Sequence, residues 1–172
     1  YNPISNLKLV SGIMPLKKMK DLDLLITVGT DGAQSNNSLD LLRDLKTGVL
    51  IQKQINNDAT FIKVKEAVEY ITKNGAKAIG LENEIGSLEV GKKADIISLD
   101  LKSVNLNPVH YNHLDNIYSA IAYSAAGSEV RDVIINGKFI MKDDQILTFD
   151  KNLILKKSKQ YAEKIMKKAK LL

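Results

Sequence analysis

The amino-acid sequence predicts an α/β fold, and three observations lead to this class. A short apolar run at residues 24–28, rich in β-branched side chains, has the composition of a strand covered on both faces. Apolar residues then recur at helical spacing over residues 39–50. From Gly86 onward the hydrophobic pattern changes to that of short strands. The strand, turn and helix of the first half form a βα unit of the kind found in parallel barrels.

Four helices are expected in the first half, after a loop over residues 1–12 in which Pro3 disfavours a helix start. The expected helices span about residues 15–20, 37–53, 63–73 and 75–80. Asn37 or Ser38 can cap the second of them, and Asn74-Gly75 should separate the third from the fourth. The side chains expected to be buried on the second and third helices are Leu39, Leu42, Leu45, Val49, Leu50, Val64, Ala67, Val68 and Ile71.

The second half should contain strands, a helical stretch at about 115–126 and a terminal helix. The expected strands span about residues 94–101, 133–135, 139–141 and 146–148. Gly91 should supply the positive φ of the turn before the first of them. Asp95 lies in that strand, and we expect its role to be structural. Asn136-Gly137 is the strongest hairpin signal in the chain and should join the second strand to the third.

Composition excludes several classes of protein. No apolar run approaches the roughly 20 residues needed to cross a bilayer. The chain has no Cys, which excludes disulfides and thiolate metal sites and fits a reducing compartment, so we expect a cytoplasmic protein. The net charge of +5 comes largely from lysines near the C-terminus. Apolar residues alternate with these lysines at helical spacing, which predicts an amphipathic helix with a solvated basic face rather than a nucleic-acid-binding surface.

Asp31 is the main candidate for chemistry. It follows the apolar run at 24–28 in a turn flanked by Gly29 and Gly32. In parallel α/β barrels the residues at the C-terminal ends of the strands carry the chemistry, which favours a functional carboxylate here. The alternative is a turn or helix-capping aspartate, the commoner role of an isolated Asp-Gly pair.

Four motifs, in order at residues 2–9, 32–37, 74–81 and 86–96, closely resemble the amidohydrolase superfamily. Within it, the sequence is most similar to the branch of S-adenosylhomocysteine and 5'-methylthioadenosine deaminases, which also contains the triazine chlorohydrolases. The resemblance implies the C-terminal part of a longer enzyme: the last strands and helices of a metal-dependent hydrolase TIM barrel, plus part of a composite β-sandwich. The implied divisions are the barrel end at 1–85, sandwich segments with an intervening helical stretch at 86–150, and a C-terminal amphipathic helix at 151–172.

The resemblance also implies roles for the candidate residues. Asp31 would be the eighth-strand metal ligand and proton carrier, and would contact the substrate. A catalytic zinc usually needs three protein ligands, and the others, histidines in this family, would precede Tyr1. We therefore expect one divalent metal, with zinc as the first candidate, in the intact enzyme, and neither bound metal nor activity in this chain alone. Asn2, Ser5 and Asn6 would shape the pocket rim, or equally act as turn residues.

Three other residues have side chains suited to proton or metal chemistry. His110 and His113 could present two ligands if both lay on one helix face, but the sequence supplies no obvious third ligand nearby, so a structural role is favoured. Many relatives have a histidine where this chain has Tyr1, and a tyrosine does not readily become cationic. We therefore expect no proton-handling role at Tyr1.

The leading functional hypothesis is hydrolytic deamination of an adenosine derivative, such as S-adenosylhomocysteine or 5'-methylthioadenosine, by a metal-activated water. Guanine deamination and triazine dechlorination are alternatives within the same mechanism. A non-catalytic structural or interaction remnant is the competing class. The expected partner is a small nucleoside, with neither nucleic acid nor membrane. Self-association is also expected, because a partial barrel leaves a strand edge and apolar surface exposed.

Overall fold

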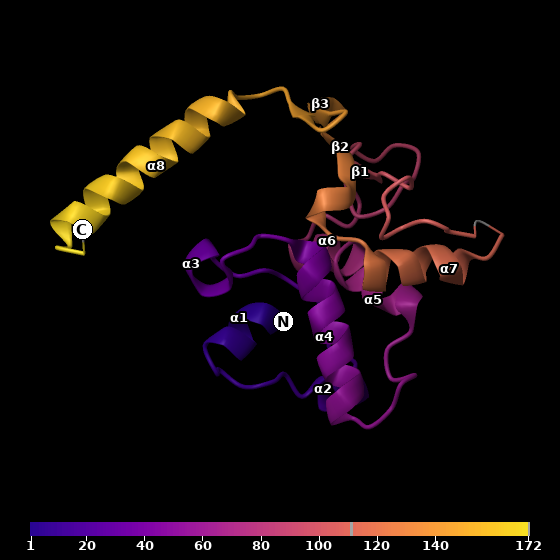
Figure 1. The fold of residues 1–172 in the computed structure, drawn as a ribbon. Coiled ribbons are helices and arrows are strands. Elements are labelled where there is room, and N and C mark those ends of the chain that lie inside the picture. The colour runs from indigo at the N-terminus through magenta and orange to yellow at the C-terminus, as the bar shows by residue number, and fades with distance from the viewer. Residues whose placement is uncertain (111, 172) are drawn as a thin grey trace.

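Helices occupy the first half of the computed structural model, and an antiparallel sheet follows them (Figure 1). The structure describes residues 1–110 and 112–171. The first six helices are α1 (Pro3–Lys8), α2 (Leu16–Asp21), α3 (Ala33–Asn36), α4 (Leu41–Ile55), α5 (Val64–Tyr70) and α6 (Lys73–Ala78). The later elements are β1 (Ile96–Leu99), α7 (Leu114–Ser119), the π-helical η1 (Ala120–Ser124), the 3-10 turn η2 (Gly127–Glu129), β2 (Val130–Ile135), β3 (Lys138–Lys142), β4 (Gln145–Ile146) and α8 (Lys151–Lys168). The predicted α/β class is confirmed.

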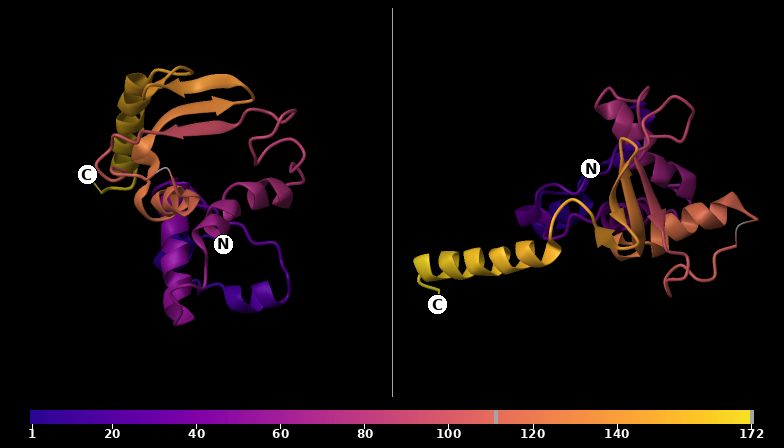
Figure 2. Two further views of the ribbon diagram at one scale, coloured as in Figure 1. Left: turned by 90° about the vertical axis from the view of Figure 1, so that its right-hand side faces the viewer. Right: turned by 90° about the horizontal axis from the view of Figure 1, so that it is seen from above.

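The four strands form one antiparallel sheet in the order β1-β2-β3-β4. Asn136 and Gly137, both with positive φ, make the turn between β2 and β3, which confirms the predicted hairpin. In the β1–β2 pair, Ile96 lies opposite Ile134. Just before β1, the Asp95 carboxylate accepts a hydrogen bond of 2.7 Å from the Asn136 N–H, so the structural role expected for Asp95 is confirmed. The sheet lies beside the helical part rather than inside it (Figure 2).

One buried face of α4 holds the helical half together. Leu45 and Val49 on this face are almost completely buried, and full burial of such a side chain stabilises the fold by about 1.5–3 kcal/mol. They share a core cluster with Leu16, Ile26, Val28, Ile62, Ala67, Tyr70 and Ala122. Gly48 lies on the same face, where an added Cβ would stand 3.1 Å from the Pro3 ring. The absence of a side chain at Gly48 therefore lets α1 approach α4 closely.

The strand predicted at residues 24–28 is wrong as a regular element, because the structure assigns no strand there. One rung of parallel pairing is present instead. The Tyr1 amino group donates to the Thr27 carbonyl, and the Gly29 N–H donates to the Tyr1 carbonyl, both at 2.9 Å. These two bonds have the slanted pattern of a parallel ladder around Val28. A strand needs a neighbour along its length, and here the neighbour turns into α1 after Asn2.

Two helix starts also differ from the prediction. Residues 1–12 are not all loop, because α1 begins at Pro3. The first N–H groups of a helix need no acceptor within the helix, so proline fits there without loss. Helix α4 begins after Asp40, whose side chain accepts a hydrogen bond from the first turn, and not after Asn37 or Ser38. Asn37 instead ends α3 in the left-handed conformation.

Two further details of the helical half were predicted wrongly. Asn74 and Gly75 lie inside α6, and the break between α5 and α6 falls at residues 71–72. The tertiary contacts of a short helix outweigh the weak helix propensity of these two residues. Leu39 and Leu50 are exposed rather than buried. Leu39 precedes α4, so the helical period that places its neighbours on the core face does not apply to it.

Helix α8 extends away from the sheet in Figure 1 and in the right-hand view of Figure 2. Asp150 caps it by accepting hydrogen bonds from the N–H groups of Asn152 and Leu153. The amphipathic pattern expected for residues 151–172 is present, but every described residue of α8 is exposed, and Leu172 lies outside the described residues. Within the described part of the chain, no helix is both long enough and apolar enough to cross a membrane.

Gly86 and Gly91 offer a matched test of packing. Both have φ near +90°, but a Cβ at Gly86 would stand 2.6 Å from the Ala76 Cβ, whereas a Cβ at Gly91 would meet open space. We expect Gly86→Ala to lower the free energy of unfolding by about 2–4 kcal/mol, from strain and overpacking together. Gly91→Ala should cost only the strain, about 1–2 kcal/mol. Urea unfolding of both variants measures the difference, and equal losses would contradict the packing at Ala76.

Self-association of the 172-residue chain is a second expectation of this fold. Residues 24–28 leave most of their backbone without a strand partner, and α8 exposes apolar side chains. The exposed apolar residues of α8 include Leu153, Ile154, Leu155 and Ile165. Such an edge and such a patch favour association. Size-exclusion chromatography across a dilution series should show concentration-dependent oligomers, and a compact monomer with a cooperative melt would contradict the expectation.

Candidate functional site

The Asp31 carboxylate lies in the turn that joins residues 26–28 to α3. Its φ of 60° falls in the left-handed region, which aspartate tolerates better than most residues. Ser5 of α1 is buried, and its hydroxyl donates a hydrogen bond of 2.6 Å to Asp31 Oδ2. The fold thus brings together two of the predicted site residues from segments far apart in the sequence.

Neutral hydrogen-bond donors stabilise the charged form of Asp31. The Ser5 hydroxyl contributes most, followed by the Gly32 N–H and the Ser35 hydroxyl, and together they hold the pKa of the Asp31 carboxyl below its ordinary value. The side chain is exposed. At neutral pH it is therefore an ionised, accessible carboxylate, which can accept a proton or bind a cation.

Asn2 and Asn6 are joined by a backbone hydrogen bond in the first turn of α1, and they border a hollow that does not contain Asp31. The Asn6 N–H donates to the Asn2 carbonyl at 2.9 Å, and the Asn2 side chain lies against Gly29. Both residues line a surface hollow of about 420 Å³ whose lining residues do not include Asp31 or Ser5. Their role at a substrate pocket stays a prediction.

A buried carboxylate that the sequence pattern did not single out is connected to the turn of Asp31 through Asn36. Asp44 of α4 is completely buried and accepts hydrogen bonds from the Ile4 N–H at 3.1 Å and from Asn36 Nδ2 at 2.8 Å. Asn36 Nδ2 also donates to the Thr30 carbonyl at 2.7 Å. Burial raises the pKa of the Asp44 carboxyl, although its two donors oppose the rise. The available signal was a charged residue within the apolar stripe of a helix.

The described residues do not supply a complete metal site. Among them, no three His, Cys, Asp or Glu side chains gather closely enough to hold a metal ion. Asp31 can offer one carboxylate, whereas a catalytic zinc needs three protein ligands and an open position. His110 and His113 precede α7 and do not share a helix face. The residues present therefore do not by themselves fit a zinc ion.

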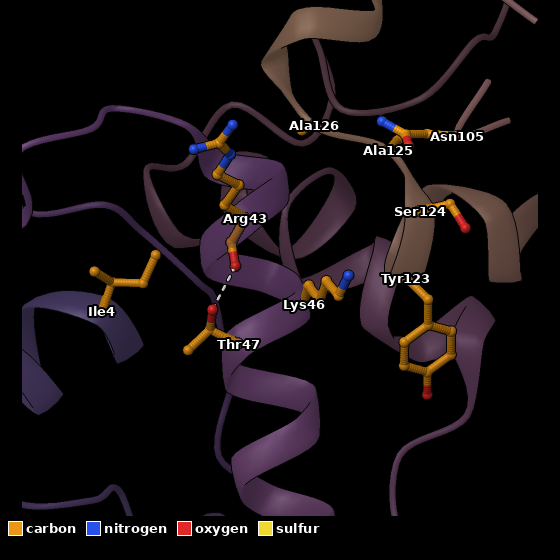
Figure 3. A pocket seen from close by; sticks show the side chains of 9 residues that line it. All are labelled: Ile4, Arg43, Lys46, Thr47, Asn105, Tyr123, Ser124, Ala125 and Ala126. Atoms are coloured by element: carbon orange, nitrogen blue, oxygen red, sulfur yellow. Dashed lines mark hydrogen bonds between the residues drawn. The ribbon is translucent and has the colours of Figure 1, made fainter. Parts of the chain in front are cut away.

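A second hollow, of about 540 Å³, lies between α1, α4 and η1 (Figure 3). Its lining includes Arg43 and Lys46 but no carboxylate or imidazole. The Arg43 guanidinium already pairs with Asp40, and the Thr47 hydroxyl donates to the Arg43 carbonyl. Figure 3 shows the side chains of Arg43 and Lys46 leaving α4 in different directions. The polar groups of this hollow thus do not converge on one point.

Comparison with known proteins decides the family. The sequence model of the amidohydrolase family matches residues 1–140. The chain belongs to the amidohydrolase family. This confirms the resemblance seen in the sequence motifs, and with it the hydrolase class of the family.

Two relatives of this amidohydrolase chain carry deaminase names. It is 40% identical to 5'-deoxyadenosine deaminase of Methanosarcina acetivorans over 169 residues, which are 98% of the chain and 38% of the relative. It is 44% identical over 150 residues to 5-methylthioadenosine/S-adenosylhomocysteine deaminase of Caldanaerobacter subterraneus, covering 87% of the chain and 34% of the relative. The chain thus spans less than two fifths of the length of these relatives.

Solved structures agree with the fold. An adenosine deaminase from Xanthomonas campestris, solved with bound zinc, matches 97% of the chain and 37% of its own length, with a TM-score of 0.89 and 32% identity. The atrazine chlorohydrolase TrzN from Arthrobacter aurescens, solved with zinc, matches 91% of the chain and 34% of its own length, with a TM-score of 0.77 and 23% identity. At 23% identity, the similarity to TrzN shows that the fold is shared and nothing more.

Removing the Ser5 hydroxyl tests the electrostatics of Asp31. We expect Ser5→Ala to raise the pKa of the Asp31 carboxyl toward its ordinary value, because the strongest donor to the charged form is lost. When the pKa of a carboxyl is lower in the folded state than in the unfolded state, its ionised form stabilises the fold at pH values above the unfolded-state pKa. This stabilisation is lost as the pH falls through the folded-state pKa. Ser5→Ala should therefore weaken the acid dependence of stability that arises from Asp31.

Carbon-detected NMR titration of the Asp31 carboxyl measures this shift. Thr60→Ala is the matched control, since the Thr60 hydroxyl donates to Asp58 at 2.7 Å and lowers the pKa of that exposed carboxyl in the same way. The control should change the pKa of the Asp58 carboxyl and leave that of Asp31 unchanged. An unchanged Asp31 titration in Ser5→Ala would contradict the hydrogen bond.

Proposed function

We propose that this chain supplies the C-terminal part of an enzyme that deaminates an adenosine derivative hydrolytically. The observation that carries the proposal is an ionised Asp31, held by Ser5 in a chain about 40% identical to adenosine-type deaminases. 5'-Methylthioadenosine, S-adenosylhomocysteine and 5'-deoxyadenosine are the substrates named for its relatives. We assign this substrate class to the intact protein.

The proposed fold of the intact protein gives each part of the chain a place. Residues 1–85 would close a metal-dependent hydrolase TIM barrel, residues 86–150 would join a composite β-sandwich, and residues 151–172 would form a terminal helix. The parallel rung between Tyr1 and the backbone around Val28 supports the first assignment, because neighbouring barrel strands run parallel. In that setting Asp31 would lie at the C-terminal end of the last strand, where barrel enzymes place their chemistry.

The reaction requires a water molecule to replace an amino group on a purine ring. The water oxygen bonds to the ring carbon, the carbon–nitrogen bond breaks, and ammonia leaves with the protons that balance the oxo product. A carboxylate within hydrogen-bond reach can take the proton from the attacking water and return it to the departing nitrogen. Asp31 is suited to this role, because Ser5, Gly32 and Ser35 keep it charged and oriented while it remains exposed.

A divalent metal, zinc in the first instance, completes the proposal for the intact protein. When bound, such an ion supplies a nucleophilic water near neutral pH. Asp31 would be one of its ligands, and the remaining ligands would come from outside the described residues. We therefore expect no stoichiometric metal and no activity from the 172-residue chain by itself. The expected surroundings are a reducing cytoplasm, with a small nucleoside as the partner.

Other substrates within the family have weaker support. The likenesses to triazine hydrolases and to a guanine deaminase lie below 25% identity and show the fold alone. A non-catalytic remnant is the alternative of another class. It predicts that an isolated longer protein releases no ammonia from any purine.

The test uses a longer protein that contains this chain, assayed for ammonia release from adenosine and guanine derivatives. We expect Asp31→Asn to lower kcat at least about 100-fold, because the neutral amide side chain can neither carry the proton nor bind the metal as a negatively charged ligand. Asp58→Asn is the matched control, since Asp58 is also an exposed turn carboxylate with a lowered pKa, and its loss should leave the rate unchanged. Metal analysis of the same samples should show a loss of bound metal in Asp31→Asn alone.

Two results would overturn the proposal. Equal rates for Asp31→Asn and the parent protein would remove Asp31 from the site. One tightly held metal ion per molecule in the isolated 172-residue chain, lost on Asp31→Asn, would show that the ligand set is complete without any further segment.

A further inference from the structure

Asp44 is a buried carboxyl group that has no cationic partner among the described residues. It is fully buried on α4, and none of the ion pairs among the described residues includes it. Burying a carboxylate in this way is costly unless hydrogen-bond donors replace the lost water. Two donors from outside α4 do so, and they come from the two segments that carry Ser5 and Asp31.

The first connection of Asp44 reaches α1. The Ile4 N–H lies in the first turn of that helix and donates to Asp44 Oδ1 at 3.1 Å. Ser5 is the next residue, so the position of its hydroxyl depends on where this turn is held. Gly48 lies one helical turn after Asp44 and permits the close approach of Pro3.

The second connection reaches the turn of Asp31 through Asn36. The two hydrogens of Asn36 Nδ2 go to Asp44 Oδ2 at 2.8 Å and to the Thr30 carbonyl at 2.7 Å, while its Oδ1 accepts from the Ser38 N–H at 3.3 Å. All the hydrogen-bonding capacity of the Asn36 amide nitrogen is therefore used. Thr30 is the residue before Asp31.

We propose that Asp44 and Asn36 form a clamp that positions Ser5 and Asp31 against each other. Its two ends hold Ile4 and Thr30, each one residue before the group that it positions. Asp44 is a positioning residue in this account, because it acts through its neighbours. The effect of the clamp on catalysis rests on the proposed function, whereas its effect on the structure does not.

The arrangement of helices supports a clamp rather than an isolated cap. Helix α1 contacts both α3 and α4, and the three lie together in Figure 1. From one buried point on α4, Asp44 accepts a hydrogen bond from α1 and is linked through Asn36 to the turn that precedes α3. The Ser5–Asp31 hydrogen bond of 2.6 Å closes the opposite side of the same ring of contacts.

Amide hydrogen exchange on the 172-residue chain tests the clamp without any assay of activity. The amides of Ser35, Asn36 and Asn37 report on the turn, because they bond to the carbonyls of Gly32 and Ala33. We expect Asn36→Ala and Asp44→Asn to speed their exchange at least about tenfold, while amides in the middle of α4 keep their rates. Asn36→Ala leaves the Asp44–Ile4 bond intact, so it remains informative if Asp44→Asn does not fold.

Gln52→Met is the matched control. Gln52 is equally buried on α4, and its side chain bonds to the Met14 carbonyl at 2.8 Å, on a different part of the molecule. Its loss should destabilise the chain without a selective effect on the turn amides. The clamp is overturned if Gln52→Met accelerates these amides as much as Asn36→Ala does, or if Asn36→Ala leaves their rates within about twofold of the parent chain.

The double variant Asn36→Asp/Asp44→Asn separates the two ends of the clamp. An asparagine at 44 can still accept from Ile4 and donate to an aspartate at 36, but that aspartate cannot donate to Thr30. We expect the Ile4 amide to exchange as slowly as in the parent chain while the turn amides exchange fast. Full recovery of the turn amides would show that the Thr30 bond contributes nothing, and would overturn the proposal.

Kinetics of the longer protein then connect the clamp to chemistry. We expect Asn36→Ala to lower kcat about tenfold or more with KM within about twofold, because misplacement of the carboxylate affects the reacting geometry more than binding. A general loss of folded protein would instead lower the active fraction and leave both constants of the remainder unchanged. If the longer protein has no deaminase activity, the proposed function fails while the exchange result still decides the clamp.

Discussion

The requirement to bury one face of α4 organises the first half of this chain. Leu45 and Val49 pack against the segment at residues 26–28 and against α5, and Gly48 leaves room for α1. These contacts bring chain segments together that share no regular sheet. Asp31 can therefore meet Ser5 even though the strand expected before it has only one rung of pairing.

Local signals in the sequence predicted the elements that depend on local physics. The Asn136-Gly137 turn forms as expected because both residues accept positive φ at little cost, and its hairpin needs no distant partner. Asp31 was found because an aspartate after an apolar run at a glycine-flanked turn is a local pattern. The α8 pattern was likewise visible from residue spacing alone.

Features that depend on distant contacts could not be read in the same way. The run at 24–28 has strand composition, yet a strand exists only where a neighbour pairs with it, and composition carries no record of the neighbour. Leu39 matches a helical stripe by spacing, but the helix starts only after Asp40, so Leu39 remains exposed. Asp44 looks like a misplaced polar residue until Ile4 and Asn36 are seen to satisfy it.

The way in which its charge is stabilised separates Asp31 from the ion-paired carboxylates of the chain. Glu66 pairs with Lys20 at 2.7 Å, and Asp143 pairs with Arg131, so the charges of these acids are largely neutralised by cations. Asp31 has its pKa lowered by neutral donors instead, which keep it ionised without cancelling its charge. Its negative field therefore remains available to a cation or to a proton on water. A hydroxyl and a backbone N–H also hold a fixed direction, which a flexible lysine does not. This combination of charge, fixed orientation and exposure is what a metal ligand or proton carrier needs. Asp58 is also exposed and held by neutral donors, so the position of Asp31, at the end of the segment that pairs with Tyr1, is what favours it for the proposed role.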